Sequence, residues 1–416
     1  MSGLRSVLLL CWRDTGHPQG GGSETYLQRI GAQLAARGVA VTLLTARYPG
    51  APRREVLDGV TVSRAGGRYS VYIWAMLAMV GARLVRFGFG PLRGTQPDVV
   101  VDTQNGIPFL ASLIFGRRAV VLVHHCHREQ WPVAGPLLGR LGWFVESRLS
   151  PWVNRRNQYV TVSLPSARDL IALGVDRRRI AIVRNGIDPA PDLVGERAQW
   201  PRVVVLSRLV PHKQIEDALE AIARLRPTTP GLHLDVVGDG WWRQHLLDCV
   251  RDHGIEDAVT FHGHVDDDTK HRILQRAWVQ LLPSRKEGWG LAVIEAAQHG
   301  VPTIGYRSAG GLSDSIIDGV TGLLVGDRAE LIDNLERLLG DPVLRGQLGV
   351  KAQLRSDEFS WSQSTDAMAS VLESVSAGHI VNGLIERRRG LDLSGGVDCS
   401  PPPHPCSDET QPAGQQ

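Results

Sequence analysis

The sequence predicts an α/β protein with two doubly wound, Rossmann-like domains that face each other across a central cleft. Short β-rich runs alternate with longer helical patterns, which is typical of a parallel sheet with helical crossovers. The alternation stops near residue 190 and then begins again, so the chain holds two such units. A length of 416 residues fits this interpretation, because domains usually have about 100–200 residues.

Each unit is expected to begin with a buried strand. In the first unit we predict a helix at residues 23–37 and strands at residues 6–11, 39–45, 99–102 and 119–125. In the second unit we predict helices at residues 216–225, 242–253 and 291–299 and strands at residues 203–207, 232–237, 259–262, 279–282 and 303–306.

A change in amino-acid composition marks the boundary between the units. Pro- and Asp-rich sequence is followed there by a charged segment. We therefore expect an N-terminal domain at residues 1–190, a linker at 191–201 and a C-terminal domain at 202–356. From residue 378 the chain becomes polar and rich in Pro and Gly, and we predict a disordered tail at 378–416.

Composition excludes several classes of protein. The net charge is only +3, which argues against a dedicated nucleic-acid binder. Five separate cysteines favour a reducing cytoplasm and give no disulfide framework or zinc site. The first apolar run is too short for a signal peptide, and the run at residues 71–82 is shorter than the ~20 residues that span a bilayer.

The segment from Pro283 onward contains the residues that most clearly indicate a ligand-binding function. A strand ends there, and the glycine-flanked turn at residues 288–290 opens a helix whose first N–H groups can receive a phosphate. Glu287 lies in the loop, and Glu295 lies on the helix. Two carboxylates around such a helix start suit a nucleotide sugar, but a helix-dipole partner and a solvated charge explain them about as well from spacing alone.

Two neighbouring segments favour the nucleotide-sugar interpretation. Arg208 and Lys213 follow a strand with a spacing that suits a diphosphate, although a solvated surface charge is the usual alternative for a lysine. Lys213 is also one of four lysines in a chain that otherwise uses arginine. At Gly238 a strand ends in a glycine turn where a backbone can approach a ligand closely.

Together these segments resemble the retaining glycosyltransferases of family 4, which have the GT-B fold. The resemblance covers about residues 7–372, and its most specific element is the E-x7-E signature formed by Glu287 and Glu295. The Arg-Leu-Val-Pro-x-Lys, Val-Gly-Asp-Gly and Asn-Gly-Ile-Asp segments stand in family order, as does a base-binding loop at residues 261–265. Ser207 and Gln214 replace common glycines and Trp289 replaces a smaller residue, which puts the shape of the donor pocket in question.

The resemblance implies a role for each matching residue. Arg208 and Lys213 would neutralise the diphosphate, Glu287 would hold donor-sugar hydroxyls and Glu295 the ribose. The other residues expected to line the nucleotide-sugar site are Gly238, His264, Val265, Gly288, Trp289, Gly290 and Leu291. The second domain would bind the donor and the first the acceptor, with a C-terminal helix at residues 357–377 crossing back to the first domain.

The first domain supplies a glycine loop and a histidine cluster. Gly21 and Gly22 lie before the first helix, where backbone N–H groups can meet a phosphate; a flexible loop capped by Ser23 is the alternative. The resemblance places His127 near the transferred sugar, with His124 or His125 in support. A metal at these histidines is disfavoured, since no further Cys/His set has metal spacing, and a strand-end histidine bonded to backbone is the remaining alternative.

Two stretches are candidates for membrane contact. Residues 69–89 are apolar, with Arg68 just before them and Arg83 and Arg86 within them, and residues 131–156 mix tryptophans with arginines. Basic and aromatic residues on one surface favour an anionic bilayer interface, but core helices with solvated charges explain the pattern equally well. The resemblance favours a lipid-linked acceptor at the inner membrane face.

The sequence therefore predicts a metal-independent retaining hexosyltransferase of the cytoplasm or the inner membrane face. Its donor would be a nucleoside diphosphate sugar of the GDP-mannose or UDP-glucose type, its acceptor a sugar or lipid-linked hydroxyl, and no other cofactor is expected. The alternative from another class is a catalytically silent nucleotide-sugar-binding or membrane-scaffold protein. A phosphorylase, an epimerase and an NAD-dependent dehydrogenase are less favoured, the last because no third glycine completes the fingerprint.

Overall fold

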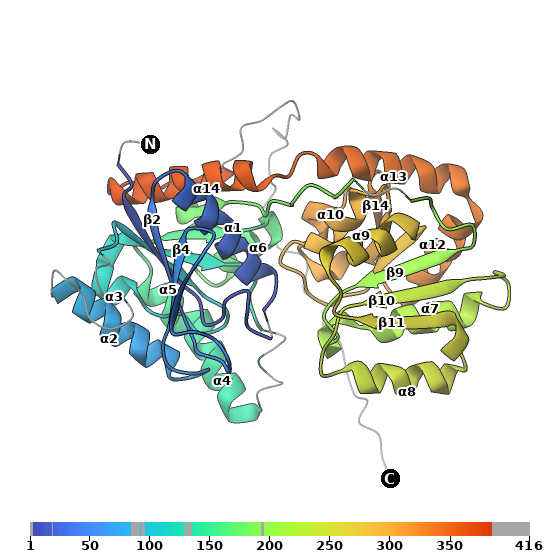
Figure 1. Ribbon diagram of the computed structural model, residues 1–416, viewed down its shortest axis with the longest axis horizontal. Helices are drawn as coiled ribbons and strands as arrows, with labels where there is room; N and C mark the ends of the chain where they lie inside the picture. Colours follow the sequence, from blue (N-terminus) through green and yellow to red (C-terminus); the bar gives the residue numbers. More distant parts are fainter. Residues whose placement is uncertain are drawn as a thin grey trace, which may run out of the picture. The chain divides into compact units, whose positions relative to one another are not determined.

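The computed structural model describes residues 3–18, 20–84, 92, 96–128, 131, 135–192 and 195–383, together with the backbone of Leu384. These residues form two separate β-sheets, each flanked by helices (Figure 1). The prediction of an α/β protein with two parallel-sheet, Rossmann-like units is confirmed.

The first sheet has the strand order β15-β8-β7-β6-β5-β1-β2-β4-β3 among the described residues. All neighbours are parallel except β3 and β4, which form an antiparallel hairpin. The strands are β1 (Ser6–Leu10), β2 (Ala40–Thr45), β3 (Arg54–Leu57), β4 (Val60–Arg64), β5 (Val99–Thr103), β6 (Ala119–Val123), β7 (Gln158–Thr161), β8 (Ile180–Ile182) and β15 (Gly383–Leu384).

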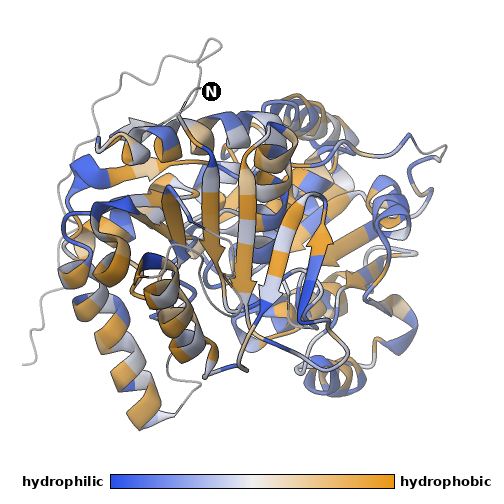
Figure 2. Cartoon of the chain, turned by 60° about the vertical axis from the view of Figure 1, so that its left-hand side comes forward, coloured by the Kyte–Doolittle hydropathy of each residue, from blue (hydrophilic) through white to orange (hydrophobic). Residues whose placement is uncertain are grey.

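Helices cover both faces of the first sheet because its strands are apolar on both sides. Val7 and Leu9 of β1 pack with α1 (Gly22–Ala36), whereas Leu8 and Leu10 pack with α2 (Val71–Leu84). Figure 2 shows the central strands as hydrophobic over most of their length. The other helical segments of this half are α3 (Ser112–Phe115), α4 (Pro136–Phe144), the π-helix η4 (Val145–Leu149), α5 (Ser150–Val153) and α6 (Leu164–Ala172).

The second sheet is parallel throughout and has the order β11-β10-β9-β12-β13-β14. Its strands are β9 (Arg202–Leu206), β10 (His233–Val237), β11 (Val259–Gly263), β12 (Val279–Leu282), β13 (Thr303–Tyr306) and β14 (Gly322–Val325). Alternate residues of β9 again face opposite layers: Val203 and Val205 join one core cluster and Val204 joins another.

The helices of the second half divide between these two core clusters. α7 (Ile215–Leu225), α8 (Arg243–His253) and α12 (Arg328–Gly340) contribute to the first, and α9 (Asp267–Arg276) and α10 (Leu291–Ala297) contribute to the second. The short helix η6 (Pro211–Lys213) follows β9, and α11 (Leu312–Ser315) and α13 (Pro342–Ser356) complete the unit.

The last helix returns to the first sheet. α14 (Trp361–Ser376) packs against α1, where Trp361 lies edge-on to Tyr26 with ring centroids 6.1 Å apart. Arg37, just after α1, donates to Asp366 of α14 at 2.6 Å. The first half of the chain therefore packs against a helix that begins more than 300 residues after the end of β1.

Several short elements escaped the sequence prediction. The β3–β4 hairpin, β7, β8 and β14 have only three to five residues each, too few for a clear periodic pattern. The strand expected at residues 119–125 ends at Val123, so the histidines that follow lie in a loop.

The first residues of the predicted tail, 378–384, have defined positions in the structure. β15 pairs in parallel with β8, and Val381 exchanges hydrogen bonds with the buried side chain of Gln158, at 2.7 Å and 2.9 Å. The rest of the predicted tail, residues 385–416, lies outside the described residues.

Truncation tests the contribution of this last segment. Removing residues 379–416 takes away both bonds between Val381 and Gln158 and leaves a buried amide short of partners, which costs about 1–3 kcal/mol. Removing residues 385–416 keeps those bonds. We expect the melting temperature of the shorter protein to lie measurably below that of the longer one, and equal melting temperatures would contradict this role.

Candidate active site

Lys213 and Glu287 form the central ion pair of the site. Lys213 ends the short helix after β9, and Glu287 lies in the loop after β12, the neighbouring strand. The Lys213 Nζ lies 2.5 Å from Glu287 Oε1, and the Ser284 hydroxyl donates to the same oxygen at 2.7 Å. The pair therefore joins two residues that are 74 positions apart.

The environment keeps Glu287 ionised. Burial opposes the charged form, but the Lys213 ammonium and the Ser284 hydroxyl outweigh it and hold the pKa of Glu287 below its ordinary value. Within the described part of the chain, both side-chain partners fall on Oε1. The other carboxylate oxygen is thus available to accept hydrogen bonds from a ligand.

Arg208 lies beside the glycine loop of the first sheet. A Cβ atom at Gly21 would lie 3.8 Å from the guanidinium carbon of Arg208, and one at Gly22 would lie 3.0 Å from the Leu291 side chain. Arg208 is exposed and forms no ion pair with the residues that the structure describes. The Arg208 guanidinium thus lies next to the glycine loop, and the nearby carboxylates of Glu24 and Glu287 favour its charge.

Gly21 caps the first helix with help from Glu24. The Gly21 N–H donates to Glu24 Oε2 at 2.8 Å, and Arg13 donates to Glu24 Oε1 at 3.0 Å. The cap is therefore a backbone–carboxylate arrangement at Gly21 rather than the Ser23 cap considered from the sequence.

Glu295 lies on α10 and pairs with a lysine from α9. Its Oε1 accepts from Lys270 Nζ at 2.8 Å, and Lys270 also pairs with Asp267 at 2.8 Å. His264 and Val265 lie just before α9 begins, His264 exposed and Val265 half-buried. Glu295 therefore belongs to a charged cluster at the α9–α10 boundary, separate from the pair at Glu287.

The turn before α10 holds the chain close to the histidine loop. A Cβ atom at Gly288 would lie 2.8 Å from the His124 carbonyl oxygen, and Gly290 adopts a positive φ of 96°. Trp289, in contrast, is 1% exposed, and its ring lies 4.8 Å from that of Phe359. Its indole belongs to the core, so only its backbone can line the pocket that the sequence assigned to it.

Gly238 allows a similarly close approach within the second sheet. Its φ is 127°, and a Cβ atom there would overlap the Ser207 carbonyl, only 2.0 Å away. No other residue fits without moving the loop that carries Arg208. The glycine therefore supports the position of a cation as well as leaving space near it.

A buried carboxylate orients His127. Glu146 Oε1 accepts from the backbone N–H of His127 at 2.9 Å and lies 3.2 Å from its Nδ1, while Trp131 Nε1 donates to Oε2 at 2.6 Å. Glu146 is fully buried on the π-helix η4, an irregularity that is frequent at functional sites. With Nδ1 facing Glu146, the other ring nitrogen is left for a ligand.

His124 and His125 differ from His127. Burial lowers the pKa of His124 to about 4, and burial followed by the nearby His127 lowers the pKa of His125 well below its ordinary value. The rings of His125 and His127 lie 4.4 Å apart. Both upstream histidines are therefore neutral near pH 7, and they support the loop without adding charge.

Sequence reasoning missed four polar residues of this site. Glu24 could have been recognised from its position three residues after the cap. Glu146, Lys270 and Ser284 gave no usable signal, because each lies on an element whose partner is set by tertiary packing. Across the described residues, no group of three or more His, Cys, Asp or Glu side chains is placed to hold a metal ion.

Two family descriptions match the chain. The family "Glycosyltransferase Family 4" matches residues 20–191, and "Glycosyl transferases group 1" matches residues 194–355. The two matches meet between the two sheets: the second contains every strand of the second sheet, and the first contains the strands from β2 to β8 of the first sheet.

Characterised relatives align over most of the chain. A glycogen synthase of Mycobacterium tuberculosis (strain ATCC 25618 / H37Rv) is 29% identical over 84% of this chain and 90% of its own length. A D-inositol 3-phosphate glycosyltransferase of Acidothermus cellulolyticus is 30% identical, with 84% and 85% covered. A GDP-mannose-dependent alpha-(1-6)-phosphatidylinositol monomannoside mannosyltransferase of M. tuberculosis (strain CDC 1551 / Oshkosh) is 29% identical, with 82% and 93% covered.

Solved structures share the fold. A sucrose-phosphate synthase from Thermosynechococcus elongatus superposes with a TM-score of 0.73 at 20% identity, covering 90% of this chain and all of the other. HepE of Anabaena, solved in complex with UDP and glucose, gives a TM-score of 0.67 at 18% identity, with 89% and 100% covered. At these identities the likeness concerns the fold alone, which is GT-B.

Buried and half-buried histidines make stability depend on pH. Burial is the main cause that lowers the pKa of His124, His212 and His299 from 6.5 to about 4. Between these values the unfolded chain binds protons that the folded chain does not, so the free energy of unfolding falls as pH falls. Asp102 opposes this in part, since burial raises its pKa to about 6.

We therefore expect the melting temperature to fall between about pH 6.5 and pH 5, because three histidines outweigh one carboxyl group. Calorimetry across this range measures the slope, and His212→Gln should flatten it. A melting temperature that rises on acidification would show that the histidines are not held neutral.

Proposed function

Because the chain belongs to the family 4 glycosyltransferases of GT-B fold, we propose that it moves a hexose from a nucleoside diphosphate sugar to an acceptor hydroxyl with retention of anomeric configuration. The observation that carries the proposal is the Lys213–Glu287 pair, which leaves one carboxylate oxygen open and whose carboxylate also interacts electrostatically with Arg208. A donor sugar and its diphosphate need acceptors and cations in this combination.

Arg208 and Lys213 stabilise the leaving group in this proposal. The bond between the anomeric carbon and the diphosphate oxygen breaks while the acceptor oxygen bonds to that carbon. The hydroxyl proton of the acceptor passes to the leaving diphosphate, which carries the negative charge that develops. Fixed donors aimed at such a charge contribute about 3–4 kcal/mol each in other enzymes. The N–H groups at the start of α10 add to this, although a helix of seven residues has a small dipole.

The two carboxylates divide the donor between them. Glu287 accepts hydrogen bonds from sugar hydroxyls through its open oxygen, and Glu295 accepts them from the ribose. Lys270 Nζ holds Glu295 in place through its 2.8 Å contact with Oε1. Part of this contact must break when the ribose binds to Glu295. Gly238, His264 and Val265 lie on the loops expected to meet the base.

His127 serves the acceptor side. Glu146 fixes its ring, so the free nitrogen can orient an acceptor hydroxyl or share developing charge at the transferred sugar. The close approach of Gly21 to Arg208 brings the glycine loop of the first sheet to the donor diphosphate. Acceptor and donor elements thus contribute to one centre.

The reaction in this proposal needs no metal ion. Two side-chain cations and backbone N–H groups take the place that a divalent cation holds in metal-dependent transferases. The donor is of the GDP-mannose or UDP-glucose type, in keeping with a relative named as GDP-mannose-dependent and a neighbour solved with UDP and glucose. The acceptor is a sugar or a lipid-linked glycan of the cell envelope.

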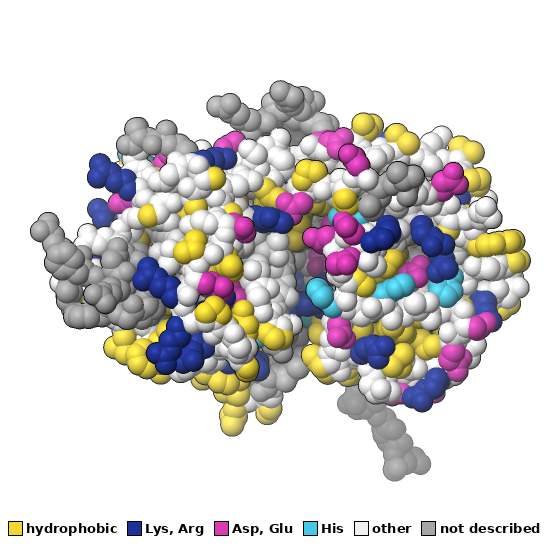
Figure 3. Space-filling view, viewed as in Figure 1, with side chains coloured by type: hydrophobic (Ala, Val, Ile, Leu, Met, Phe, Trp, Pro, Cys, Tyr) yellow, Lys and Arg dark blue, Asp and Glu magenta, His cyan; other side chains and the backbone are white. Residues whose placement is uncertain are grey.

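We also propose that the first half of the chain contacts the cytoplasmic membrane peripherally. The helices of the described residues are all too short or too polar to cross a bilayer. Yet α2 and α4 expose large apolar side chains, and Figure 3 shows hydrophobic side chains gathered over both helices. Those more than half exposed are Ile73, Trp74, Leu77 and Leu84 of α2 and Leu137, Leu138, Leu141 and Phe144 of α4.

Only some of the arginines and tryptophans that the sequence suggested for membrane contact lie on this surface. Arg140 is exposed on α4, and Arg155 lies over the exposed ring of Trp152 at 5.3 Å. Trp131, in contrast, turns inward to Glu146, so it cannot insert into a membrane. Arg86 lies outside the described residues.

Donor binding and transfer test the proposed function. We expect UDP, GDP or one of their hexose esters at ~100 times its dissociation constant to stabilise the protein by ~2.7 kcal/mol, seen as a thermal shift. Lys213→Ala should abolish the shift, because the diphosphate loses a cation, and Lys351→Ala, on the exposed side of α13, should keep it. Glu287→Ala should lower the transfer rate at least about a hundredfold.

The same assays distinguish the alternative. A nucleotide shift without transfer to any acceptor would favour a silent nucleotide-sugar-binding protein. No shift with any nucleotide would reject the donor site and favour a membrane scaffold. Transfer that EDTA abolishes and Mg²⁺ restores would refute the metal-free mechanism.

Vesicle flotation tests the membrane surface. The protein should float with vesicles that contain anionic lipid, and replacing Leu137, Leu138 and Leu141 by Ser should release it, because these exposed side chains supply the apolar contact. The matched control replaces Val343, Val350 and Leu354, which are similarly exposed on α13. Equal flotation of both triple variants would place the contact elsewhere.

A further inference from the structure

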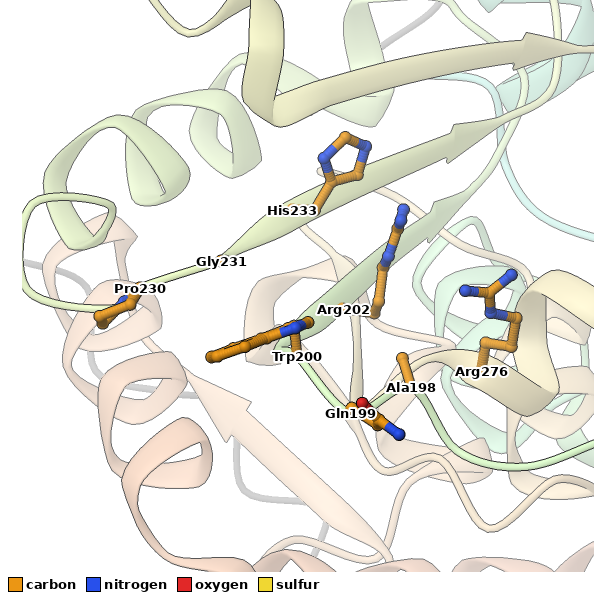
Figure 4. Close-up of a pocket in the computed structure, with 8 residues that line it drawn as sticks. All are labelled: Ala198, Gln199, Trp200, Arg202, Pro230, Gly231, His233 and Arg276. Carbon is orange, nitrogen blue, oxygen red and sulfur yellow. The ribbon is translucent and has the colours of Figure 1, made fainter.

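A cavity lies on the second half of the chain, at the edge of the sheet opposite to the candidate active site. It has a volume of about 440 Å³ and is lined by Gln199, Trp200, Arg202, Gly231, His233 and Arg276, among others (Figure 4). Arg202 and His233 begin β9 and β10, whereas Arg208 and Gly238 follow the other ends of these strands. Five residues of strand, about 17 Å, separate the two edges.

The segment that carries Trp200 is held firmly against the second half. The Ala198 N–H donates to the Arg276 carbonyl at 3.1 Å, and the Ala198 carbonyl accepts from Trp278 Nε1 at 2.7 Å. Arg197 donates to the His299 carbonyl at 2.8 Å. The wall of the cavity is therefore formed before any ligand arrives, which lowers the entropy cost of binding.

Trp200 offers a flat aromatic surface. It is 63% exposed, although its ring rests on the chain at Gly231, where a Cβ atom would lie 3.1 Å from the indole. Gly231 has a positive φ of 73°, so both its conformation and its missing side chain let the ring lie against the backbone. An exposed indole held in place in a cavity is a surface for stacking.

The polar groups around the indole carry little net charge. One guanidinium nitrogen of Arg202 donates to both carboxylate oxygens of Asp235 at 3.1 Å, and this ion pair neutralises the charge of Arg202. Burial and then the neighbouring Arg202 lower the pKa of His233, so it is neutral near pH 7. Arg276 is exposed and has no ion-pair partner among the residues that the structure describes.

We propose that this cavity binds a segment of a neutral glycan chain. The apolar face of a hexose stacks on the Trp200 indole, and its hydroxyls accept hydrogen bonds from Arg276 and from the amide of Gln199. A phosphate would need several uncompensated cations or a cluster of backbone N–H groups, and here Arg276 alone is uncompensated among the described lining residues. A neutral, hydroxyl-rich ligand with a flat apolar face fits the observed groups better.

The inference goes beyond the proposed transfer, because binding at this edge requires no reaction at the other. A glycan long enough to reach from the cavity to the active site would bind at two places, which raises its effective concentration at the acceptor site. The cavity would then favour polymeric over short acceptors.

Binding of soluble oligosaccharides to the full-length protein tests the proposal. We would titrate maltoheptaose, cellopentaose and a linear mannopentaose by isothermal calorimetry and saturation-transfer NMR. At least one should bind, and Trp200→Ala should weaken that binding about tenfold. Arg276→Ala, an exposed change that leaves the core intact, should weaken it severalfold, and Trp200→Tyr should restore part of it.

Two matched variants separate this site from the rest of the molecule. Trp152→Ala removes another exposed tryptophan that stacks with an arginine and should leave binding unchanged. Glu287→Ala disables the proposed donor site and should also leave it unchanged. If an oligosaccharide binds in a way that depends on Trp200 but the protein shows no transferase activity, the proposed function is wrong and this inference stands.

Two outcomes would overturn the proposal. The first is that none of the oligosaccharides binds. The second is binding that Glu287→Ala abolishes and Trp200→Ala does not affect, which would place the sugar in the active-site cleft. In the first case, binding of inorganic phosphate or UMP that is lost in Trp200→Ala would show that the cavity takes an anion instead.

Discussion

The ion pair between Lys213 and Glu287 is the interaction on which the candidate site depends. Bringing an ammonium and a carboxylate out of water is costly, and the cost is offset only by close geometry and by further hydrogen bonds such as the one from Ser284. The geometry arises because β9 and β12 are neighbours in a parallel sheet, so the loops that follow them emerge side by side. The pair both fixes the loop of Glu287 and leaves one oxygen of its carboxylate open.

A second constraint is steric. Gly22 and Gly288 lie where the elements of the first sheet meet those of the second, and a Cβ atom at these positions would lie 3.0 Å from the Leu291 side chain and 2.8 Å from the His124 carbonyl oxygen. These glycines allow backbone from one half to approach cations and turns from the other. An electrostatic centre assembled from two sheets therefore depends on residues that have no side chain at all.

The same parallel sheet has two edges with different chemistry. Its carboxyl edge collects the cations and carboxylates of the proposed donor site, whereas its amino edge carries the indole of Trp200 beside neutralised or neutral polar groups. Charge suits a nucleotide at one edge, and a flat, nearly neutral wall suits a glycan at the other. A polymeric acceptor bound at the amino edge would make its second contact near His127 in the first half of the chain, because the carboxyl edge is taken by the proposed donor.

By itself, the sequence determined the two α/β units, the family resemblance and the positions of Arg208, Lys213, Glu287 and Glu295, because these follow from periodic burial and from short motifs within single loops. Tertiary structure alone decided that Glu146 orients His127, that Lys270 holds Glu295 and that Trp289 faces the core. It also decided the order of the short strands that the periodic pattern missed. The physical reason is the same in each case. The burial of a side chain and the identity of its hydrogen-bond partner depend on elements that are distant in the chain, and the local sequence does not show which of these elements will pack together.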